Sequence, residues 1–173
     1  MNKLITFTTQ LLILFVSFIT IQAATAQCSS CNFTYSAPGT SSLSLNGNNK
    51  TYCLTGSGEY SGNISLNGNN SILCIGENVV FTGSIDITSS SAEVNNYGTI
   101  NTSSISFSGT LNNYGLMQVN GDIDVNSSGN LNNYNTSYGA MEINGALNVN
   151  SGADMVVQGT VIINGDVTVD GGG

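Results

Sequence analysis

The chain lacks the side chains on which most catalytic sites depend. Its 173 residues include no histidine, no arginine and no tryptophan, and only two lysines. Without histidine, neither a Ser-His-Asp nor a Cys-His catalytic arrangement can be built, and a zinc site loses its commonest nitrogen ligand. The composition therefore argues against an enzyme, and we expect no catalytic residues and no cofactor.

Positive charge is nearly absent as well. After position 26 the chain has Lys50 against ten carboxylates, which gives a side-chain charge of −9. Proteins recognise nucleic acids and anionic membrane surfaces through clustered Lys and Arg, so neither is expected as a partner. Asn, Ser, Thr and Gly are plentiful, as in disordered chains, but 40% of the residues are hydrophobic and they recur in a pattern.

Residues 1–26 have the features of a secretory signal peptide. Lys3 is followed by the apolar run Leu11–Ile21 and by the small-x-small sequence Ala24–Ala26. A membrane-spanning helix would need about 20 mostly apolar residues, which is longer than the run Leu11–Ile21. A lipid anchor on Cys28 would need a small residue at the preceding position, which is occupied by Gln27. We therefore predict cleavage after residue 26 and a secreted or cell-surface protein that does not insert into the membrane.

The rest of the chain is a repeat. Each unit begins with an apolar-x-apolar triplet, and the starts are spaced 21, 21, 20, 18, 24 and 20 residues apart. The starts are Leu43, Ile64, Ile85, Ile105, Ile123, Leu147 and Val167. An alternation of period two is typical of a strand with one buried face.

Two further apolar positions recur in each unit. One falls four residues before the next start, at Tyr60, Phe81, Val119, Ile143 and Ile163, with Asn101 as the exception. The other falls mid-unit, at Cys53, Cys74, Val94, Leu111, Leu131 and Met155. Three short strands per unit, none able to bury its face alone, predict an all-β fold. We expect a single-stranded parallel β-helix, or solenoid, of about six coils of roughly 20 residues each.

This pattern divides the chain into three segments: the signal peptide 1–26, a short Cys-containing N-terminal cap 27–42, and solenoid repeats over 43–173. The last repeat in the sequence, "VTVDGGG", stops one strand into a coil. An open rung exposes apolar side chains and unpaired backbone groups. We therefore expect either that the repeats continue beyond residue 173 or that a partner covers the end, which would include end-to-end self-association.

Four cysteines are disulfide candidates: Cys28, Cys31, Cys53 and Cys74. Cys53 and Cys74 lie 21 residues apart, one coil, so we expect them to be stacked neighbours within reach of a bridge. Three pairings are open. A thioredoxin-like redox role for Cys28 and Cys31 is disfavoured because no strand-to-helix setting follows them.

An Asn-Asn-Tyr motif recurs in three successive units, as "VNNYG", "LNNYG" and "LNNYN". Stacking the units would align Asn95, Asn112 and Asn132, then Asn96, Asn113 and Asn133, then Tyr97, Tyr114 and Tyr134. Stacked amides can hydrogen-bond along the axis, and stacked rings bury apolar area. We interpret the motif as a ladder that stabilises a corner; the alternative is that the tyrosines form a sugar-stacking stripe.

One acidic segment is a weak calcium candidate. Asp122, Asp124 and Asn126 resemble the opening of an EF-hand loop, but Ser127 replaces the turn glycine and Asn133 replaces the bidentate glutamate. As a glycosidase pair, the two carboxylates would lie on an outer face without a pocket to separate their pKa values. A solvated outer face is therefore favoured over a metal or catalytic site.

The "ATAQC" segment, the Cys-containing cap and coils such as "INGDVTV" and "LNNYG" resemble the N-terminal portions of large secreted β-helix proteins of Bacteroidota, often adhesin-like. The resemblance implies a non-enzymatic adhesin or structural repeat protein that contacts glycans or proteins through polar outer faces. Two alternatives are the N-terminal fragment of a carbohydrate-active β-helix enzyme and an ice-binding solenoid. The β-helix lyases generally use Arg or Lys as a base, and after position 26 this chain has only Lys50. Ice binding requires regular ranks of threonine, whereas the outward residues of the triplets are a mixture of Ser, Asp, Asn and Thr.

Overall fold

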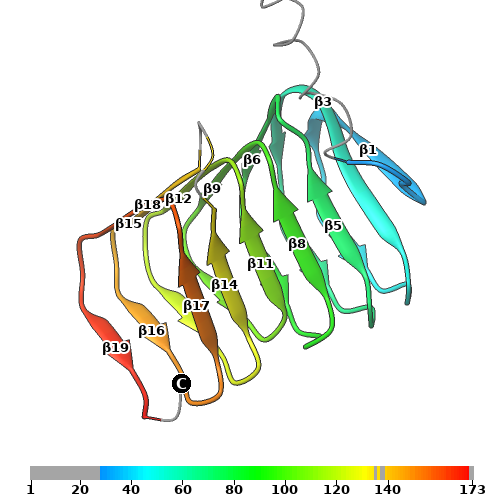
Figure 1. Ribbon diagram of the computed structural model, residues 1–173. Coiled ribbons are helices and arrows are strands. Elements are labelled where there is room, and N and C mark those ends of the chain that lie inside the picture. The colour runs from blue at the N-terminus through cyan, green and yellow to red at the C-terminus, as the bar shows by residue number, and fades with distance from the viewer. Residues whose placement is uncertain (1–27, 135, 137–138, 172–173) are drawn as a thin grey trace, which may run out of the picture.

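The computed structural model describes residues 28–134, 136 and 139–171; the predicted signal peptide lies outside them. The described residues contain nineteen strands and no helix, and the strands wind into a parallel β-solenoid of about seven turns (Figure 1). The described residues contain no helix long and apolar enough to cross a membrane. The predicted all-β solenoid is therefore confirmed.

Three faces run along the solenoid. The first face holds β5 (Ile72–Ile75), β8 (Glu93–Asn96), β11 (Thr110–Asn113), β14 (Asn130–Asn133) and β17 (Asp154–Val157). The second holds β6 (Val79–Thr82), β9 (Thr99–Thr102), β12 (Leu116–Val119), β15 (Ala140–Ile143) and β18 (Thr160–Ile163). The third holds β2 (Leu43–Leu45), β4 (Ile64–Leu66), β7 (Ile85–Ile87), β10 (Ile105–Phe107), β13 (Ile123–Val125), β16 (Leu147–Val149) and β19 (Val167–Val169).

Two long strands join the first and second faces. β3 (Thr51–Ser61) pairs with β5 through its first residues and with β6 through its last, so it crosses the corner between the two faces. β1 (Phe33–Thr40) pairs with β3 from Phe33 opposite Tyr52 to Thr40 opposite Ser61. The segment 27–42, expected as a cap, thus contains a strand that forms a rung of its own, and this rung brings the number of turns to about seven.

The core is a narrow column of aliphatic and aromatic side chains. On the third face both apolar residues of each triplet point inward, and from Leu43 to Val149 all of them are buried. Equivalent residues are register partners in adjacent rungs, for example Ile85 with Ile105 and Ile105 with Ile123. In the last turn, Val167 and Val169 occupy the same inward positions but are 56% and 63% exposed.

The predicted mid-unit column is wrong at its first two members. Cys53 pairs with Cys74, and Cys74 pairs with Asn95, whose column faces outward. The inward positions belong to Tyr52 and Leu73, which are buried and continue into Val94. Successive residues of a strand point to opposite faces, so an error of one residue in the alignment exchanges inside for outside.

The predicted apolar column that lies four residues before each third-face strand also needs correction, at its exception Asn101. Phe81 pairs with Ile100, and Ile100 pairs with Met117, whereas Val119 pairs with Thr102. The connection from this column to the third face becomes one residue longer after Ile100 and one longer again after Met117, and then keeps its length. Counting a fixed four residues back therefore shifts the register. Asn101 therefore points outward, and the polar exception in the inward column is Thr102, which is 3% exposed and donates its hydroxyl to the Ser104 carbonyl oxygen.

Two disulfides fix the N-terminal segment to the outside of the first face. Cys53 and Cys74 are stacked neighbours as predicted, but they are bridged to Cys31 and Cys28 rather than to each other. Their outward direction explains the pairing, because it aims both sulfurs at the segment that lies over the face. Stable bridges of this kind indicate an oxidising compartment.

Glycines allow successive turns to approach closely where the second face passes into the third. Gly62 and Gly83 have φ angles of +151° and +149°. A Cβ atom added to Gly83 would lie 1.8 Å from the Gly62 carbonyl oxygen. Any other residue at position 83 would therefore push its Cβ atom against the backbone of Gly62. It would also have to adopt a backbone conformation that is rare for L-residues.

Replacing Gly83 with alanine is expected to destabilise the solenoid by about 1–3 kcal/mol, the usual cost of a strained backbone conformation. Gly171→Ala is the matched control, because a Cβ there meets no atom within 4 Å. Thermal unfolding followed by far-ultraviolet dichroism measures both variants. Equal melting temperatures for the two would contradict the close approach at Gly83.

Candidate functional site

The inner asparagines of the repeated motif form a buried amide ladder. Asn96 Nδ2 donates to Asn113 Oδ1 at 2.7 Å, and Asn113 Nδ2 donates to Asn133 Oδ1 at 2.7 Å. All three side chains are buried. Each Nδ2 also donates across the corner to a carbonyl oxygen of the second face, those of Leu116, Ala140 and Thr160. The ladder therefore ties adjacent turns together and also fixes the angle between two faces.

The ladder ends where the column becomes apolar. Ile75 occupies the equivalent position in the preceding turn and offers no donor. Among the described residues, Asn96 Oδ1 is buried without a hydrogen-bond partner. Since an unsatisfied buried acceptor costs stability, the gain from the ladder is smallest at this end.

The outer asparagines form a second ladder on the solvent side of the first face. Asn112 Nδ2 donates to Asn95 Oδ1 at 2.9 Å, and Asn132 Nδ2 donates to Asn112 Oδ1 at 2.8 Å. Asn112 Nδ2 also donates to Glu93 Oε1 at 2.9 Å. Asn112 is buried, but Asn95 and Asn132 are only half-buried, so water competes for their amides. This ladder is therefore expected to contribute less to stability than the inner one.

The difference between the ladders can be measured with one substitution in each. Asn113→Ala removes two side-chain donors and leaves the buried Asn133 Oδ1 without its partner, so it is expected to cost roughly 2–4 kcal/mol. Asn132→Ala, in the outer ladder, is expected to cost less than about 1 kcal/mol. Chemical denaturation yields both free energies of unfolding. Similar losses would show that burial does not separate the two ladders.

The tyrosines of the motif stack as parallel rings. The centroids of Tyr97 and Tyr114 are 4.8 Å apart with an interplanar angle of 9°, and those of Tyr114 and Tyr134 are 4.4 Å apart with an angle of 3°. Both faces of Tyr114 are therefore covered by its neighbours. The interpretation of the tyrosines as a sugar-stacking stripe is wrong for the middle ring, because a sugar needs an uncovered ring face.

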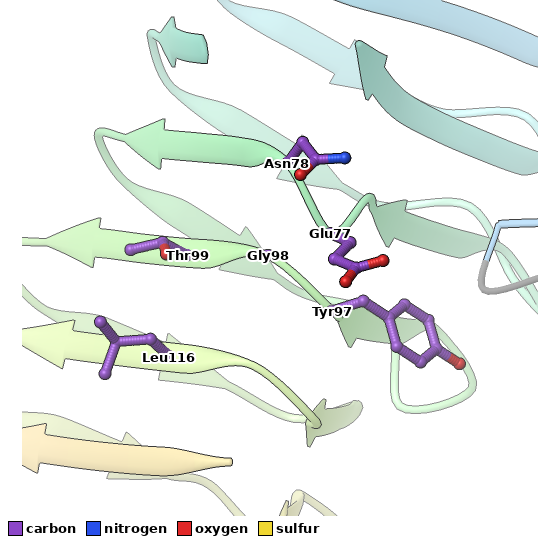
Figure 2. A pocket seen from close by; sticks show the side chains of 6 residues that line it. All are labelled: Glu77, Asn78, Tyr97, Gly98, Thr99 and Leu116. Atoms are coloured by element: carbon purple, nitrogen blue, oxygen red, sulfur yellow. The ribbon is translucent and has the colours of Figure 1, made fainter. Parts of the chain in front are cut away.

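The stack ends at Tyr97 because the preceding turn has a glycine at that place. Ile75 pairs with Asn96, and the Tyr97 amide donates to the Ile75 carbonyl oxygen at 2.9 Å, so Gly76 is the register neighbour of Tyr97. Gly76 has no side chain to lay over the ring. Figure 2 shows Tyr97 projecting away from the strands, with Glu77 beside it.

A hollow of about 430 Å³ opens at this ring. It is lined by Glu77, Asn78, Tyr97, Gly98, Thr99 and Leu116 (Figure 2). Glu77 and Asn78 come from the turn between β5 and β6, whereas Thr99 and Leu116 begin β9 and β12. The hollow therefore combines one aromatic ring with a carboxylate, an amide, a hydroxyl and one exposed aliphatic side chain.

A second hollow, of about 410 Å³, lies on the other side of Tyr97. It is lined by Cys28, Ser29, Ser30, Thr51, Ile72, Cys74, Asn95 and Tyr97. Thr51, Ile72 and Asn95 belong to the outward side of β3, β5 and β8, so this hollow lies over the first face. Its wall is the N-terminal segment that the disulfides hold in place.

The surroundings of Tyr97 and Tyr114 raise the pKa of their phenols. Burial, followed by the neighbouring Tyr134 and Tyr97 and by Glu93, raises the pKa of Tyr114 from 10.0 to about 12. Burial and the Glu93 carboxylate also raise the pKa of Tyr97. The folded state therefore holds the phenol protons of Tyr97 and Tyr114 more tightly than the unfolded chain does.

This difference predicts a loss of stability in alkali. The contribution of Tyr114 is fully present below pH 10, where the unfolded phenol is still protonated, and is lost as the pH rises through about 12. Melting temperatures measured across this range should fall more steeply for the native chain than for Tyr114→Phe, which cannot ionise. Parallel pH profiles would exclude a role for the phenol at position 114.

The weak calcium candidates do not converge on a common point. Asp122 Oδ1 accepts the Ala146 amide at 2.7 Å, and Asp124 Oδ1 accepts Asn148 Nδ2 at 2.8 Å. Asn126 Oδ1 accepts the amide of the next asparagine in its column, at 3.3 Å. Within the described part of the chain, no three His, Cys, Asp or Glu side chains are grouped as a metal site would need. These residues instead serve as rungs of outer polar ladders.

The chain matches no protein-family model, no curated protein and no solved structure. The geometry at Tyr97 is therefore the main evidence on function. Sequence reasoning named Tyr97 but missed Glu77, Asn78, Thr99 and Leu116. An alignment that placed Cys74 over Asn95 would have set Gly76 over Tyr97 and shown that the stack stops there.

Proposed function

We propose that this protein is a non-enzymatic, exported β-solenoid that binds neutral glycans at the hollow around Tyr97. The observation that carries the proposal is that Tyr97 ends the tyrosine stack, with Tyr114 on one ring face and a hollow with hydrogen-bonding side chains beside the ring. The disulfides support an oxidising compartment, as expected for an exported protein.

The chemistry of the hollow suits a sugar ring. The C–H face of a pyranose is apolar and can pack on an aromatic ring, while its hydroxyls need polar partners at the rim. The Glu77 carboxylate can accept two hydroxyl hydrogen bonds, and the Asn78 amide can both donate and accept. Leu116, which is 41% exposed, adds apolar surface beside the ring.

The charge distribution favours neutral sugars over acidic ones. Glu77 lines the hollow and Glu93 lies close enough to affect Tyr97, whereas Lys50 is the only basic residue after position 26. A uronic acid or sulfated sugar would be repelled by these carboxylates. The same lining supports binding without hydrolysis, because glycosidases use two carboxylates and this hollow offers one.

Binding at one shallow site is expected to be weak. A dissociation constant of about 1 mM corresponds to roughly −4 kcal/mol, which a single stacked ring with a few hydrogen bonds can supply. Many copies displayed together would raise the overall affinity by avidity without any new contact. An adhesin-like role at a surface is consistent with this arrangement.

The test is a glycan array probed with the chain that remains after the predicted cleavage at residue 26, here called the exported chain. Calorimetry on the neutral glycans that bind follows. Tyr97→Ala removes the ring and is expected to weaken binding at least about tenfold, or 1.4 kcal/mol. Tyr97→Phe is the matched control, because it keeps the ring face and should retain most of the affinity. A silent array, or equal affinities for the alanine and phenylalanine variants, would refute the proposal.

A further inference from the structure

The two hollows described above meet at one side chain. Tyr97 lines both of them. The first opens toward β9 and β12 on the second face, and the second lies over β3, β5 and β8 on the first face. Tyr97 therefore lies at the corner between the first and second faces, with one recess on each face. A line from one recess to the other crosses the long axis of the solenoid.

The N-terminal segment forms one side of the second hollow. Cys28 is bridged to Cys74, with 5.6 Å between their Cα atoms, and this bridge places Ser29 and Ser30 opposite Ile72 and Asn95. Further along, the Asn32 side-chain oxygen accepts the Thr51 amide at 2.8 Å. The segment thus forms a fixed wall.

Both recesses have the chemistry of a sugar subsite. The second one combines the exposed hydroxyls of Ser29 and Ser30 and the Asn95 amide with the half-buried aliphatic side chain of Ile72. Volumes of about 430 and 410 Å³ fall within the range of pockets that hold small ligands. None of the described residues that line the two recesses has a basic side chain, so both suit the same neutral class of ligand.

We infer that the two hollows are adjoining subsites of one groove that binds an extended neutral oligosaccharide across the corner. One sugar unit stacks on Tyr97, and the chain continues on one side toward Glu77 and Thr99 and on the other side along the N-terminal segment. The Cys28–Cys74 disulfide then has a role in ligand selection, because it positions the wall of the second subsite. This inference rests on the proposed function and adds the length and orientation of the ligand.

The test compares ligand length across variants. The probes are β-1,4-linked and α-1,4-linked glucose oligosaccharides and β-1,4-linked N-acetylglucosamine oligosaccharides, each from the single sugar to the tetrasaccharide. Calorimetry with the exported chain should show affinity for at least one series rising about tenfold or more from disaccharide to tetrasaccharide, as expected when a second subsite is filled.

Two variants remove the second subsite in different ways. Cys28→Ser combined with Cys74→Ser releases the wall, and Ile72→Trp fills the recess. Each should lower tetrasaccharide affinity to the level of the disaccharide while leaving disaccharide affinity unchanged. Thr110→Trp is the control for the second variant, because Thr110 lies in the same outward column, beyond Glu93. Melting temperatures establish that each variant is folded.

The outcomes separate this inference from the proposed function. If all lengths bind equally well and binding still depends on Tyr97, the groove is refuted and the single-site proposal stands. If the tetrasaccharide preference survives both in the double cysteine variant and in Ile72→Trp, the second subsite is likewise refuted. If no neutral oligosaccharide binds at any length, the proposed function and the groove are both wrong.

Discussion

The structure depends on parallel, in-register pairing of each turn with the next. Every strand hydrogen-bonds to the equivalent strand one turn away, so a side chain has its own counterpart as its nearest neighbour along the axis. Apolar residues in register form a continuous thin core, and polar residues in register must satisfy one another. The buried Asn96, Asn113 and Asn133 show the second case. The side-chain oxygens of Asn113 and Asn133 each accept from the preceding asparagine, and among the described residues only the oxygen of Asn96, at the end of the column, has no partner.

The same constraint decides where a ligand could bind. A ladder of identical side chains covers its own surfaces, as the faces of Tyr114 are covered by Tyr97 and Tyr134. Chemically distinctive surface therefore appears where a column is interrupted, not where it is most regular. Gly76 is such an interruption: it ends the tyrosine stack and leaves room beside Tyr97 for Glu77 and for the hollow. The candidate site is in this sense a defect in the repeat.

The N-terminal segment adds an element that the repeat could not supply. β1 covers the edge of β3, which would otherwise present unpaired backbone groups. The bridges from Cys28 to Cys74 and from Cys31 to Cys53 then attach the preceding residues to two successive turns. Closing loops of this length typically contributes about 2–4 kcal/mol for each bridge. One short segment thus stabilises the first turns and forms a wall beside Tyr97.

The spacing of the repeats was enough to predict the approximate length of each turn, the inward pairs of the third face and the alignment of the Asn-Asn-Tyr motifs, but not the additional rung formed by β1. These features follow from spacing and period two, which are local properties. Three features became evident from the pairing of the turns: Cys53 and Cys74 face outward, Thr102 rather than Asn101 enters the core, and the tyrosine stack ends at Tyr97 beside a hollow. Spacing alone could not predict these features because the connections between strands differ in length from turn to turn, so the register of each strand is set by its partner in the adjacent turn. A shift of one residue then exchanges buried and exposed side chains.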